Sequence, residues 1–309
     1  RSIHLCICRY GLDREILVGN SLIDMYMSCK CIVDAFQVFE LMLLRDVVTW
    51  SSLIAGYADQ GRIEDTLQLF FCMQKDGVEP NKVTYLSIVK ACSNPASFDL
   101  GKLVHGCIIE SGHDVDQCIK SSLIEMHSKC GRFEDASNIF DRGETKDVVA
   151  YGTMLAACAQ NRDFESAVHY FEAMKHNSLS PDAEVFACLL SACSQEGLME
   201  YGFDLFGSIR GGCDLMQSLY VYNCMIDLLA RAGYLVEAMD LTLSLPFDAN
   251  VFGWTSLLEH CKTHGHAGLG KDCFKSLLGM EGDDAGPFVA MARLLTSVEN
   301  MEGFQRYTR

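Results

Sequence analysis

The chain has 309 residues, of which 49% are hydrophobic and 21% are charged, and its formal net charge is -16. This length exceeds one compact core, so the chain forms either two domains or an elongated array with a continuous core. The acidic balance, if it is spread evenly, argues against a nucleic-acid partner, because binding phosphates usually needs a basic surface.

Similar blocks of sequence recur along the chain. They are EILVGNSLIDMYMSC (15–29), DVVTWSSLIAGYADQ (46–60), DQCIKSSLIEMHSKC (116–130) and DVVAYGTMLAACAQN (147–161). Aligning the rest of the chain to these blocks gives units that begin at Ile16, Val47, Lys82, Gln117, Val148, Ala183, Leu219 and Val251. The starts are 31, 35, 35, 31, 35, 36 and 32 residues apart, which indicates a repeat protein. Apolar residues spaced by three and four predict two helices in each unit.

Fixed positions in the units predict how these helices turn and pack. Near the fifteenth position, five units have a glycine that can reverse the chain, namely Gly61, Gly131, Gly197, Gly233 and Gly265. Lys30, Ala96 and Arg162 replace it elsewhere, and those turns are expected to close differently. The twentieth position is small in all units but one, and four residues later most units have a large anchor: Phe39, Phe70, Phe140, Phe171, Phe206 and Phe274. A single hairpin cannot bury its own apolar face, so an all-α solenoid of stacked hairpins is expected.

The alternation of unit lengths resembles the PLS subfamily of plant pentatricopeptide repeat proteins. VGNSLIDMY (18–26) and DVVTWSSLIAGYA (46–58) resemble its short and ordinary motifs, and YLSIVKACS (85–93) with GKLVHG (101–106) resembles its long motif. YNCMIDLLARAGYLVEA (222–238) resembles the final short motif. WTSLLEHCKTHGH (254–266) resembles the first of the extension motifs that end many of these proteins. The resemblance implies a right-handed superhelix of helix-turn-helix repeats.

The resemblance also implies motif boundaries over the whole chain. The chain is expected to be a fragment that lacks both native ends, because it begins inside one motif and stops inside another. The expected motifs are a partial long repeat (1–15), short repeats (16–46, 117–147), ordinary repeats (47–81, 148–182), long repeats (82–116, 183–218), a final short repeat (219–250), a first extension motif (251–282) and a truncated second one (283–309).

In the resembled family, the fifth and last residues of a motif form one pocket for one base of single-stranded RNA. Carried over, the resemblance implies uracil for Asn20 with Asp46, adenine for Ser51 with Asn81, guanine for Ser121 with Asp147, and a pyrimidine for Asn223 with Asn250. Gly152 with Asp182 departs from the informative pairs and is a weaker candidate. The predicted register is 5′-U-A-x-G-x-x-Y-3′, with x unread. An alternative for the last positions is that Asp and Asn only cap the following helix.

The acidic charge is unevenly distributed over the units. The first fourteen positions of the units, which form the presumed RNA-facing helices, hold seven acids and six bases, so this face carries only -1 of the charge. The bases are Lys82, Lys90, Lys120, Lys129, Arg231 and Lys262. This face is not basic, so modest affinity with weak salt dependence is expected.

Residues that could bind a metal have a simpler interpretation. Cysteines recur at fixed unit positions, which favours packing over metal binding; they are Cys29 and Cys130 at the fourteenth and Cys92, Cys158, Cys193 and Cys261 at the eleventh. The densest group of possible ligands is His260, Cys261, His264 and His266, but Gly265 marks a turn among them. The chain has neither the His-x-Glu nor the Cys-x-x-Cys motif of zinc deaminases and no phosphate loop, so neither an enzyme nor a cofactor is expected.

The resemblance therefore implies a protein that binds single-stranded organellar RNA and selects sites for C-to-U editing, and the editing role rests on the resemblance alone. The deaminase, of the DYW type in this family, would lie downstream or act in trans through residues 251–309. A factor for RNA stability, splicing or translation and a protein-binding scaffold are the alternatives. The mitochondrion is slightly favoured over the chloroplast, and no membrane partner is expected, because no apolar run approaches the roughly 18 residues that span a bilayer.

Overall fold

A computed structural model describes residues 4, 7, 9, 15–143, 146–209, 218–245, 251–280, 288–289 and 291–293. Among these residues the regular structure is helical and no strand occurs, which confirms the predicted all-α fold. The chain divides into two compact units, Arg1–Lys146 and Asp147–Arg309. The motifs expected over 1–15 and 283–309 lie almost entirely outside the described residues.

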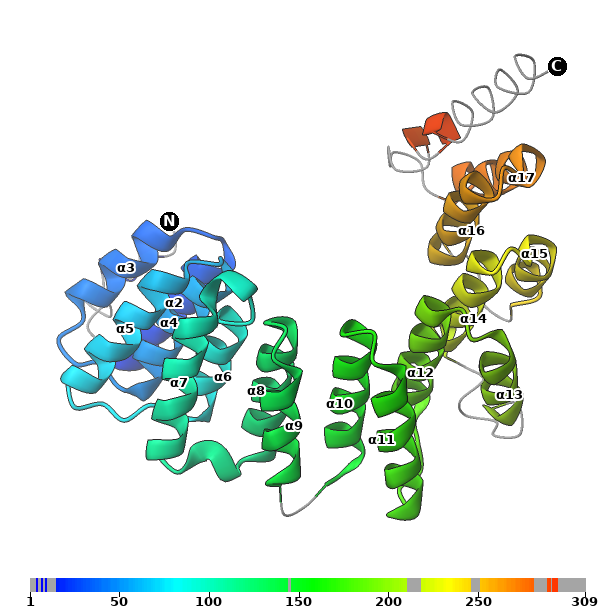
Figure 1. Cartoon of the computed structure of the whole chain (residues 1–309). Coiled ribbons are helices and arrows are strands. Elements are labelled where there is room, and N and C mark those ends of the chain that lie inside the picture. Colours follow the sequence, from blue (N-terminus) through cyan, green and yellow to red (C-terminus); the bar gives the residue numbers. More distant parts are fainter. Residues whose placement is uncertain are drawn as a thin grey trace. The chain divides into compact units, whose positions relative to one another are not determined.

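The first unit is a stack of helical hairpins (Figure 1). Its helices are α2 (Ile16–Ser28), α3 (Ile32–Leu41), α4 (Val47–Asp59), α5 (Ile63–Lys75), α6 (Lys82–Ala91), α7 (Phe98–Glu110), α8 (Gln117–Lys129) and α9 (Phe133–Asp141), with the short 3-10 helices η2 (Pro95–Ser97) and η3 (His113–Val115). The first helices α2, α4, α6 and α8 pack against one another in succession and form one layer. The second helices α3, α5 and α7 each pack against their own first helix and against the first helix of the next hairpin, and α9 packs against α8.

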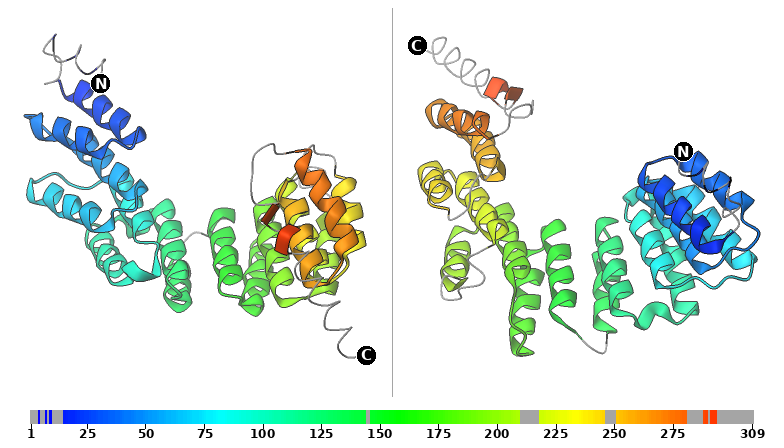
Figure 2. Two further views of the ribbon diagram at one scale, coloured as in Figure 1. Left: turned by 90° about the horizontal axis from the view of Figure 1, so that it is seen from above. Right: turned by 180° about the vertical axis from the view of Figure 1, so that it is seen from behind.

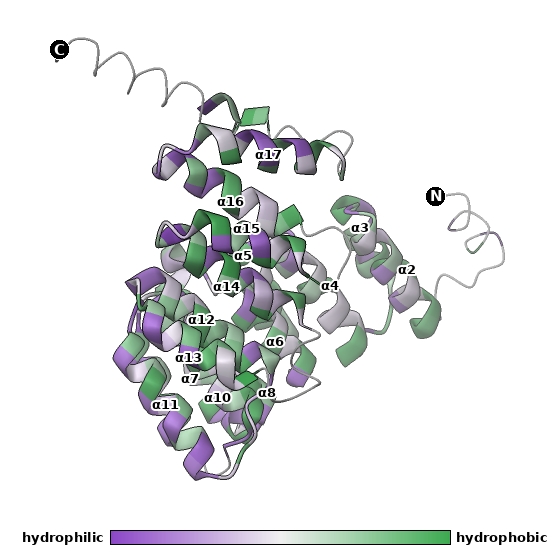
Figure 3. Ribbon diagram, turned by 90° about the vertical axis from the view of Figure 1, so that its right-hand side faces the viewer, coloured by the Kyte–Doolittle hydropathy of each residue, from purple (hydrophilic) through white to green (hydrophobic). Residues whose placement is uncertain are grey.

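The second unit repeats this arrangement (Figure 2). Its helices are α10 (Val148–Gln160), α11 (Phe164–His176), α12 (Ala183–Glu196), α13 (Met199–Ile209), α14 (Leu219–Arg231), α15 (Leu235–Leu243), α16 (Val251–Thr263) and α17 (Ala267–Leu278). Here α10, α12, α14 and α16 form the layer of first helices. In both units, the first helices begin at the residues that begin the sequence repeats. Hydrophobic and hydrophilic residues lie side by side along α11 and α17, as expected for helices that bury one face (Figure 3).

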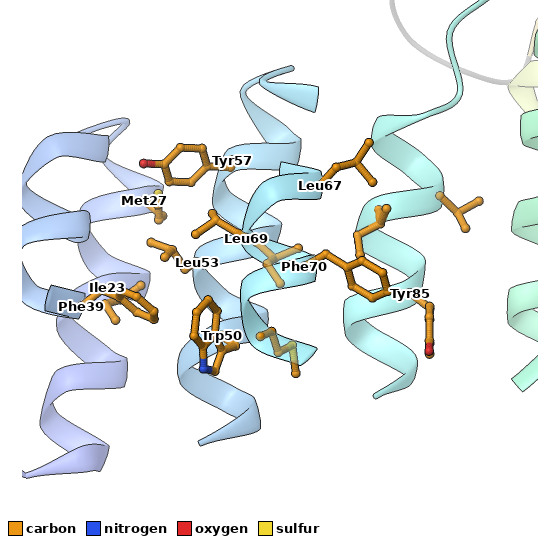
Figure 4. Packing of buried hydrophobic residues seen from close by; sticks show 14 of the residues in the cluster. Ile23, Met27, Phe39, Trp50, Leu53, Tyr57, Leu67, Leu69, Phe70 and Tyr85 are labelled. Carbon is orange, nitrogen blue, oxygen red and sulfur yellow. The ribbon is translucent and has the colours of Figure 1, made fainter. Parts of the chain in front are cut away.

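An aromatic pair joins consecutive hairpins. The anchor Phe39 of α3 packs edge-on against Trp50 of α4, with ring centroids 4.7 Å apart, and Phe70 of α5 packs against Tyr85 of α6 at 5.9 Å (Figure 4). All four rings are buried. The second unit has the corresponding pairs Phe171–Phe186 and Phe206–Tyr222. In every case the partner is the fourth residue of the next repeat, which explains why a phenylalanine recurs in the second helices.

Two turns without glycine close in the same way as the glycine turns, so the expectation that they differ was wrong. Lys30 and Arg162 have φ of 58° and 56°, close to the 71° of Gly61. The hydrogen bonds agree as well: Cys31 N donates to Tyr26 O at 2.8 Å, as Arg62 N donates to Tyr57 O at 3.1 Å. These bonds stabilise a left-handed residue that otherwise costs about 1 kcal/mol without glycine. The turn at Ala96 does differ, because η2 forms there.

The small residues at the twentieth position lie where helices cross closely. A Cβ added to Gly202 would clash with Leu228 Cδ2, and one added to Gly101 would come 2.9 Å from Met126 Sδ. Ala35 and Ala136 are likewise fully buried. Most repeated cysteines also pack as predicted, since Cys92, Cys158, Cys193 and Cys261 are buried; burial raises the pKa of Cys158 to about 12. The packing interpretation was wrong for Cys29, which is exposed, whereas Cys130 at the same repeat position is half-buried.

A buried histidine of α8, His127, contacts the half-buried His105 of α7. His127 is 2% exposed, and its Nε2 lies 3.2 Å from Nδ1 of His105. Burial, with smaller contributions from His105, Arg132 and Lys102, lowers the pKa of His127 to about 4, although Asp135 raises it. The His127 Nδ1 lies 3.9 Å from the Asp135 carboxylate, too far for a hydrogen bond. The fold therefore holds His127 neutral.

This burial predicts a loss of stability in mild acid. A histidine in the unfolded chain has a pKa near 6.5, so the unfolded state binds a proton below that pH. The folded state binds it only near pH 4. The free energy of unfolding should therefore fall by about 2 kcal/mol between pH 7 and pH 5. Thermal melting of the wild type and of His127→Gln over this range measures the effect. The variant should show a flatter pH profile; identical profiles would contradict the assignment.

Candidate functional site

The first predicted pair, Asn20 with Asp46, is joined by hydrogen bonds. Asn20 is a buried residue of α2, and its Nδ2 donates to Asp46 Oδ1 at 3.3 Å. Asp46 is the N-cap of α4, where Oδ1 also accepts from Thr49 N at 2.8 Å. The hydroxyl of Thr49 lies 2.6 Å from Asn20 Oδ1 and 2.9 Å from Asp46 Oδ1. The structure thus brings the two residues together and adds Thr49 to them.

The hydrogen bonds keep Asp46 ionised. Burial raises its pKa, but donors from Thr49 and Asn20 lower it by more, so the net pKa lies below the ordinary value. The hydrogen bonds to Asp46 all end on its Oδ1, and they use one of the two hydrogens of the Asn20 amide. A carboxylate oxygen (Oδ2) and an amide hydrogen are left for a ligand. The pair therefore combines one acceptor with one donor.

The second pair, Ser51 with Asn81, has the same arrangement one repeat later. Asn81 caps α6, and its Oδ1 accepts from Thr84 N at 3.0 Å and lies 3.0 Å from the Thr84 hydroxyl oxygen. Ser51 Oγ lies 2.8 Å from Thr84 Oγ1 and 3.5 Å from Asn81 Oδ1. The Ser51 hydroxyl donates to Val47 O at 2.6 Å, which leaves its oxygen as an acceptor. The Asn81 amide nitrogen takes no part in these bonds and can donate.

A groove lies beside this second pair. It has a volume of about 510 Å³ and is lined by residues of α2, α4 and the start of α6. Ser51 and Asn81 lie in its wall, together with the apolar side chains of Val48 and Val83. Polar residues of the second pair and apolar side chains therefore line the same groove.

Val48 and Val83 belong to a set of residues that the sequence argument missed. The second residue of a first helix is exposed and apolar in most repeats: Leu17, Val48, Val83, Val149, Tyr220 and Phe252 are 50–81% exposed. Cys118 is exposed as well, and Glu184 is the polar exception. Exposed apolar residues that recur at one repeat position indicate a binding surface. The aligned repeats contained the evidence for this surface, because their second position is usually apolar although it lies outside the face that each first helix buries.

The remaining predicted pairs are described only in part. Ser121 lies in the first unit, with its Oγ buried and without a hydrogen-bond partner, whereas Asp147 lies in the second unit and caps α10. Asn223 is 8% exposed and its buried Oδ1 has no partner, but Asn250 lies outside the described residues.

The weaker candidates, Gly152 and Asp182, also lie in the second unit. Asp182 caps α12 through a hydrogen bond from Val185 N at 2.9 Å. Gly152 is partly buried, with ordinary space for a Cβ, because the nearest atom would be Val185 Cγ2 at 3.8 Å. Gly152 has no side chain, so this pair offers only the carboxylate of Asp182.

Most bases of the first helices are neutralised by nearby acids. Four ion pairs occur there: Lys82–Asp116 (3.0 Å), Lys90–Asp59 (3.0 Å), Lys129–Glu125 (2.6 Å) and Arg231–Asp227 (3.2 Å). In the part of the chain that the structure describes, Lys120 and Lys262 have no ion pair. The surface that carries the candidate pairs is thus close to neutral, as the sequence indicated.

Asp227 connects three first helices of the second unit. Its Oδ2 accepts from Ser194 of α12 at 2.6 Å, and its Oδ1 accepts from Ser256 of α16 at 2.9 Å. Burial raises the pKa of Asp227, but these two serines and Arg231 lower it by more, so the net pKa lies below the ordinary value. The network joins the helix of the expected extension motif to the repeats before it.

The histidines near residue 260 make hydrogen bonds to the backbone. His260 Nδ1 lies 2.8 Å from Ser256 O, and His264 Nε2 lies 3.1 Å from Arg231 O. Over the described ranges, no three His, Cys, Asp or Glu side chains are grouped as they would be to hold a metal ion. The same ranges contain no helix that is long and apolar enough to cross a membrane.

Comparison with protein families finds repeats of one kind along the chain. The PPR repeat family matches residues 45–94 and 146–195, and the PPR repeat itself matches 20–47, 120–148, 184–211 and 220–243. Together these matches cover more than half of the chain. They include Asn20, Ser51 and Ser121.

Curated relatives come from Arabidopsis thaliana. A putative pentatricopeptide repeat-containing protein is 33% identical over 96% of this chain and 40% of its own length. The chloroplastic pentatricopeptide repeat-containing protein CRR2 is 32% identical over 99% of this chain and 47% of its own length. A mitochondrial pentatricopeptide repeat-containing protein is 33% identical, with the same coverage. The chain thus spans less than half the length of these relatives.

A solved structure shares the fold. The pentatricopeptide repeat protein PPR10, in complex with an 18-nt psaJ RNA element, matches with a TM-score of 0.73 and 17% identity over 99% of this chain and 46% of that chain. At this identity the likeness shows an α-solenoid of helical hairpins and no more. With the repeat matches and the Arabidopsis relatives, it follows that the chain belongs to the pentatricopeptide repeat family.

Proposed function

We propose that the protein binds single-stranded RNA and selects its sequence through the paired side chains of consecutive repeats. The observation that carries this proposal is the repeated geometry of Asn20–Asp46 and Ser51–Asn81. Each pair places the fifth residue of one first helix beside the N-cap of the next. A surface with one such pair per hairpin suits a strand whose bases are splayed out one by one.

The atoms left over in each pair suit the edge of a base. The first pair offers the Asn20 amide and the second oxygen of Asp46, and the second pair offers the Asn81 amide and Ser51 Oγ. One donor beside one acceptor can meet the Watson–Crick edge of a nucleobase. The assignment of uracil to the first pair and adenine to the second comes from the family resemblance.

The exposed second residues of the first helices supply the apolar part of the site. Val48 and Val83 line the groove beside Ser51 and Asn81. A base whose edge meets the pair would lay its faces against such side chains, and stacking against the face of a base is tolerant of sequence. The apolar residues would thus contribute affinity, while the polar pairs would contribute selection.

Helix capping and base recognition are compatible in these pairs. Asp46 and Asn81 both cap their helices through Oδ1 alone, which leaves the second terminal atom of each side chain for a base. The relative with a solved structure was found with an RNA element, which supports the same function here.

The specific role proposed is the selection of sites for C-to-U editing in a plant organelle. It rests on the resemblance of the repeat lengths to the PLS subfamily and of residues 251–282 to an extension motif. The extension would hold a DYW-type deaminase that lies downstream or acts in trans. The relatives named chloroplastic and mitochondrial support an organelle without deciding between the two. A factor for RNA stability, splicing or translation is the alternative.

Base selection predicts that Ser51→Asn changes the preferred second base. The variant creates Asn with Asn81, the combination to which the resemblance assigns a pyrimidine. Binding of the full chain to RNA oligonucleotides of the register 5′-U-A-x-G-x-x-Y-3′, with each base at the second position, measures the change. Preference should move from adenine to a pyrimidine by about tenfold, the effect of roughly 1.4 kcal/mol.

A matched control is Ser21→Asn, because Ser21 is exposed on α2 and belongs to no pair. It should leave the second position unchanged. A wild-type protein that enriches no sequence from a randomised RNA pool would disprove base selection altogether.

The ion pairs predict weak salt dependence. Only Lys120 and Lys262 lack an acidic partner among the described bases of this face, so about two phosphates should be neutralised. A plot of log Kobs for RNA binding against log salt concentration should then have a slope of about -1 to -2. A slope near -4, which roughly corresponds to six contacts, would mean that the ion pairs open to bind phosphate.

The editing role predicts a lost C-to-U conversion in plants that lack the protein. Sequencing of organellar transcripts should show one or more unedited cytidines close to sequences that fit the register. An unchanged editing pattern together with altered transcript levels or splicing would instead favour the alternative role.

A further inference from the structure

Two repeats have a buried threonine as the third residue of a first helix. Thr49 of α4 and Thr84 of α6 are both fully buried. In the other first helices this position is apolar or glycine: Val18, Ile119, Ala150, Val185, Val221 and Gly253. A hydroxyl in a buried place is costly unless it is hydrogen-bonded, so its contacts indicate why it is there.

Both threonines connect a helix cap with the fifth residue of the preceding repeat. Thr49 Oγ1 lies 2.6 Å from Asn20 Oδ1 and 2.9 Å from Asp46 Oδ1. Thr84 Oγ1 lies 2.8 Å from Ser51 Oγ and 3.0 Å from Asn81 Oδ1. The threonine oxygens also accept from the backbone N–H of the caps, at 3.2 Å for Asp46 and 3.3 Å for Asn81.

The hydrogen bond that caps the helix decides which terminal side-chain atom remains available to a ligand at the last residue of each repeat. A helix N-terminus presents N–H donors, so it takes an oxygen, and Oδ1 accepts from the third backbone N–H in both pairs. A carboxylate then has a second acceptor left, whereas an amide has only its NH₂ donor left. Aspartate and asparagine at this place therefore offer opposite polarity to a ligand because the helix cap orients them.

The threonine orients the fifth residue in the same way. The short bond to Thr49 holds the Asn20 amide oxygen toward α4 and leaves its nitrogen beside Asp46. The Ser51 hydroxyl already donates to Val47 O, so the contact with Thr84 holds the serine oxygen close to Asn81. Without the hydroxyl, the Asn20 amide could flip and Ser51 could rotate away.

We propose that Thr49 and Thr84 are positioning residues for base selection, each of which fixes the outward atoms of the pair beside it. The proposal rests on the proposed function, since it concerns how these pairs select a base. The threonines lie behind the pairs, fully buried, and do not themselves contact the RNA.

The test replaces the hydroxyl and keeps the shape. In the full chain, Thr84→Val should reduce the ratio of the dissociation constants for guanine and adenine at the second position by about fivefold, as for the loss of one hydrogen bond. The ratio for cytosine and uracil at the first position should stay unchanged. Thr49→Val should do the reverse, and Thr84→Ser should restore the wild-type ratio. The probes are RNA oligonucleotides of the predicted register that differ only at the tested base.

Controls separate positioning from stability. Thr153→Val is the matched control, because the Thr153 hydroxyl bonds only to Val149 O on its own helix, α10, and it should change neither ratio. Circular dichroism and melting temperature establish whether each variant folds. If Thr84→Val does not fold, Thr49→Val carries the same test at the first position.

The outcomes distinguish this proposal from the one on which it rests. Folded valine variants that bind all oligonucleotides less well, with unchanged ratios, overturn positioning, because the hydroxyls would then serve stability alone. Folded variants that behave as wild type overturn it as well. A wild-type protein that selects no base at either position overturns the proposed function and this inference together.

Discussion

The contact between the anchor phenylalanine of one hairpin and the aromatic fourth residue of the next is the interaction on which the other features depend. A repeat protein has no single central core, so each hairpin is placed by its neighbours alone. The pairs Phe39–Trp50 and Phe70–Tyr85 bury large rings edge-on at this junction. The residue after Trp50 is Ser51, whose place beside the next repeat is therefore set by the ring that precedes it. A hydrophobic contact thus determines where a polar pair can form.

Capping gives the same polar pair a second reason to be ordered. The N-terminus of each first helix needs acceptors for its free N–H groups, and Asp46 and Asn81 provide them. The bonds that cap the helix also fix which atom of the side chain stays outside. Helix stability and ligand recognition are therefore not competing uses of these residues. In the proposed function the same bonds would serve both, so a short side chain at a helix end could both cap the helix and select a base.

The features that were predictable from the sequence are those set by spacing. The helix starts follow the aligned blocks because the apolar period and the cap residues recur together, and Phe39 and Phe70 are anchors because they recur at one position. The turns at Lys30 and Arg162 were predicted wrongly because backbone hydrogen bonds can stabilise a left-handed turn, and such bonds cannot be predicted from the residue type. Thr49 was missed because a contact 29 residues along the chain is visible only once the hairpins are stacked.

The near-neutral surface has a consequence for how such a protein would select RNA. Basic proteins gain affinity for any sequence from released counterions, and this gain dilutes selection. Here Lys82, Lys90 and Lys129 are held by acids on or beside the same face, so that non-specific gain is small. In the proposed function, more of the affinity for RNA would then come from apolar contact at exposed residues such as Val48 and from the polar pairs. Of these two, only the pairs distinguish one base from another, so a weakly charged surface favours selection over strength of binding.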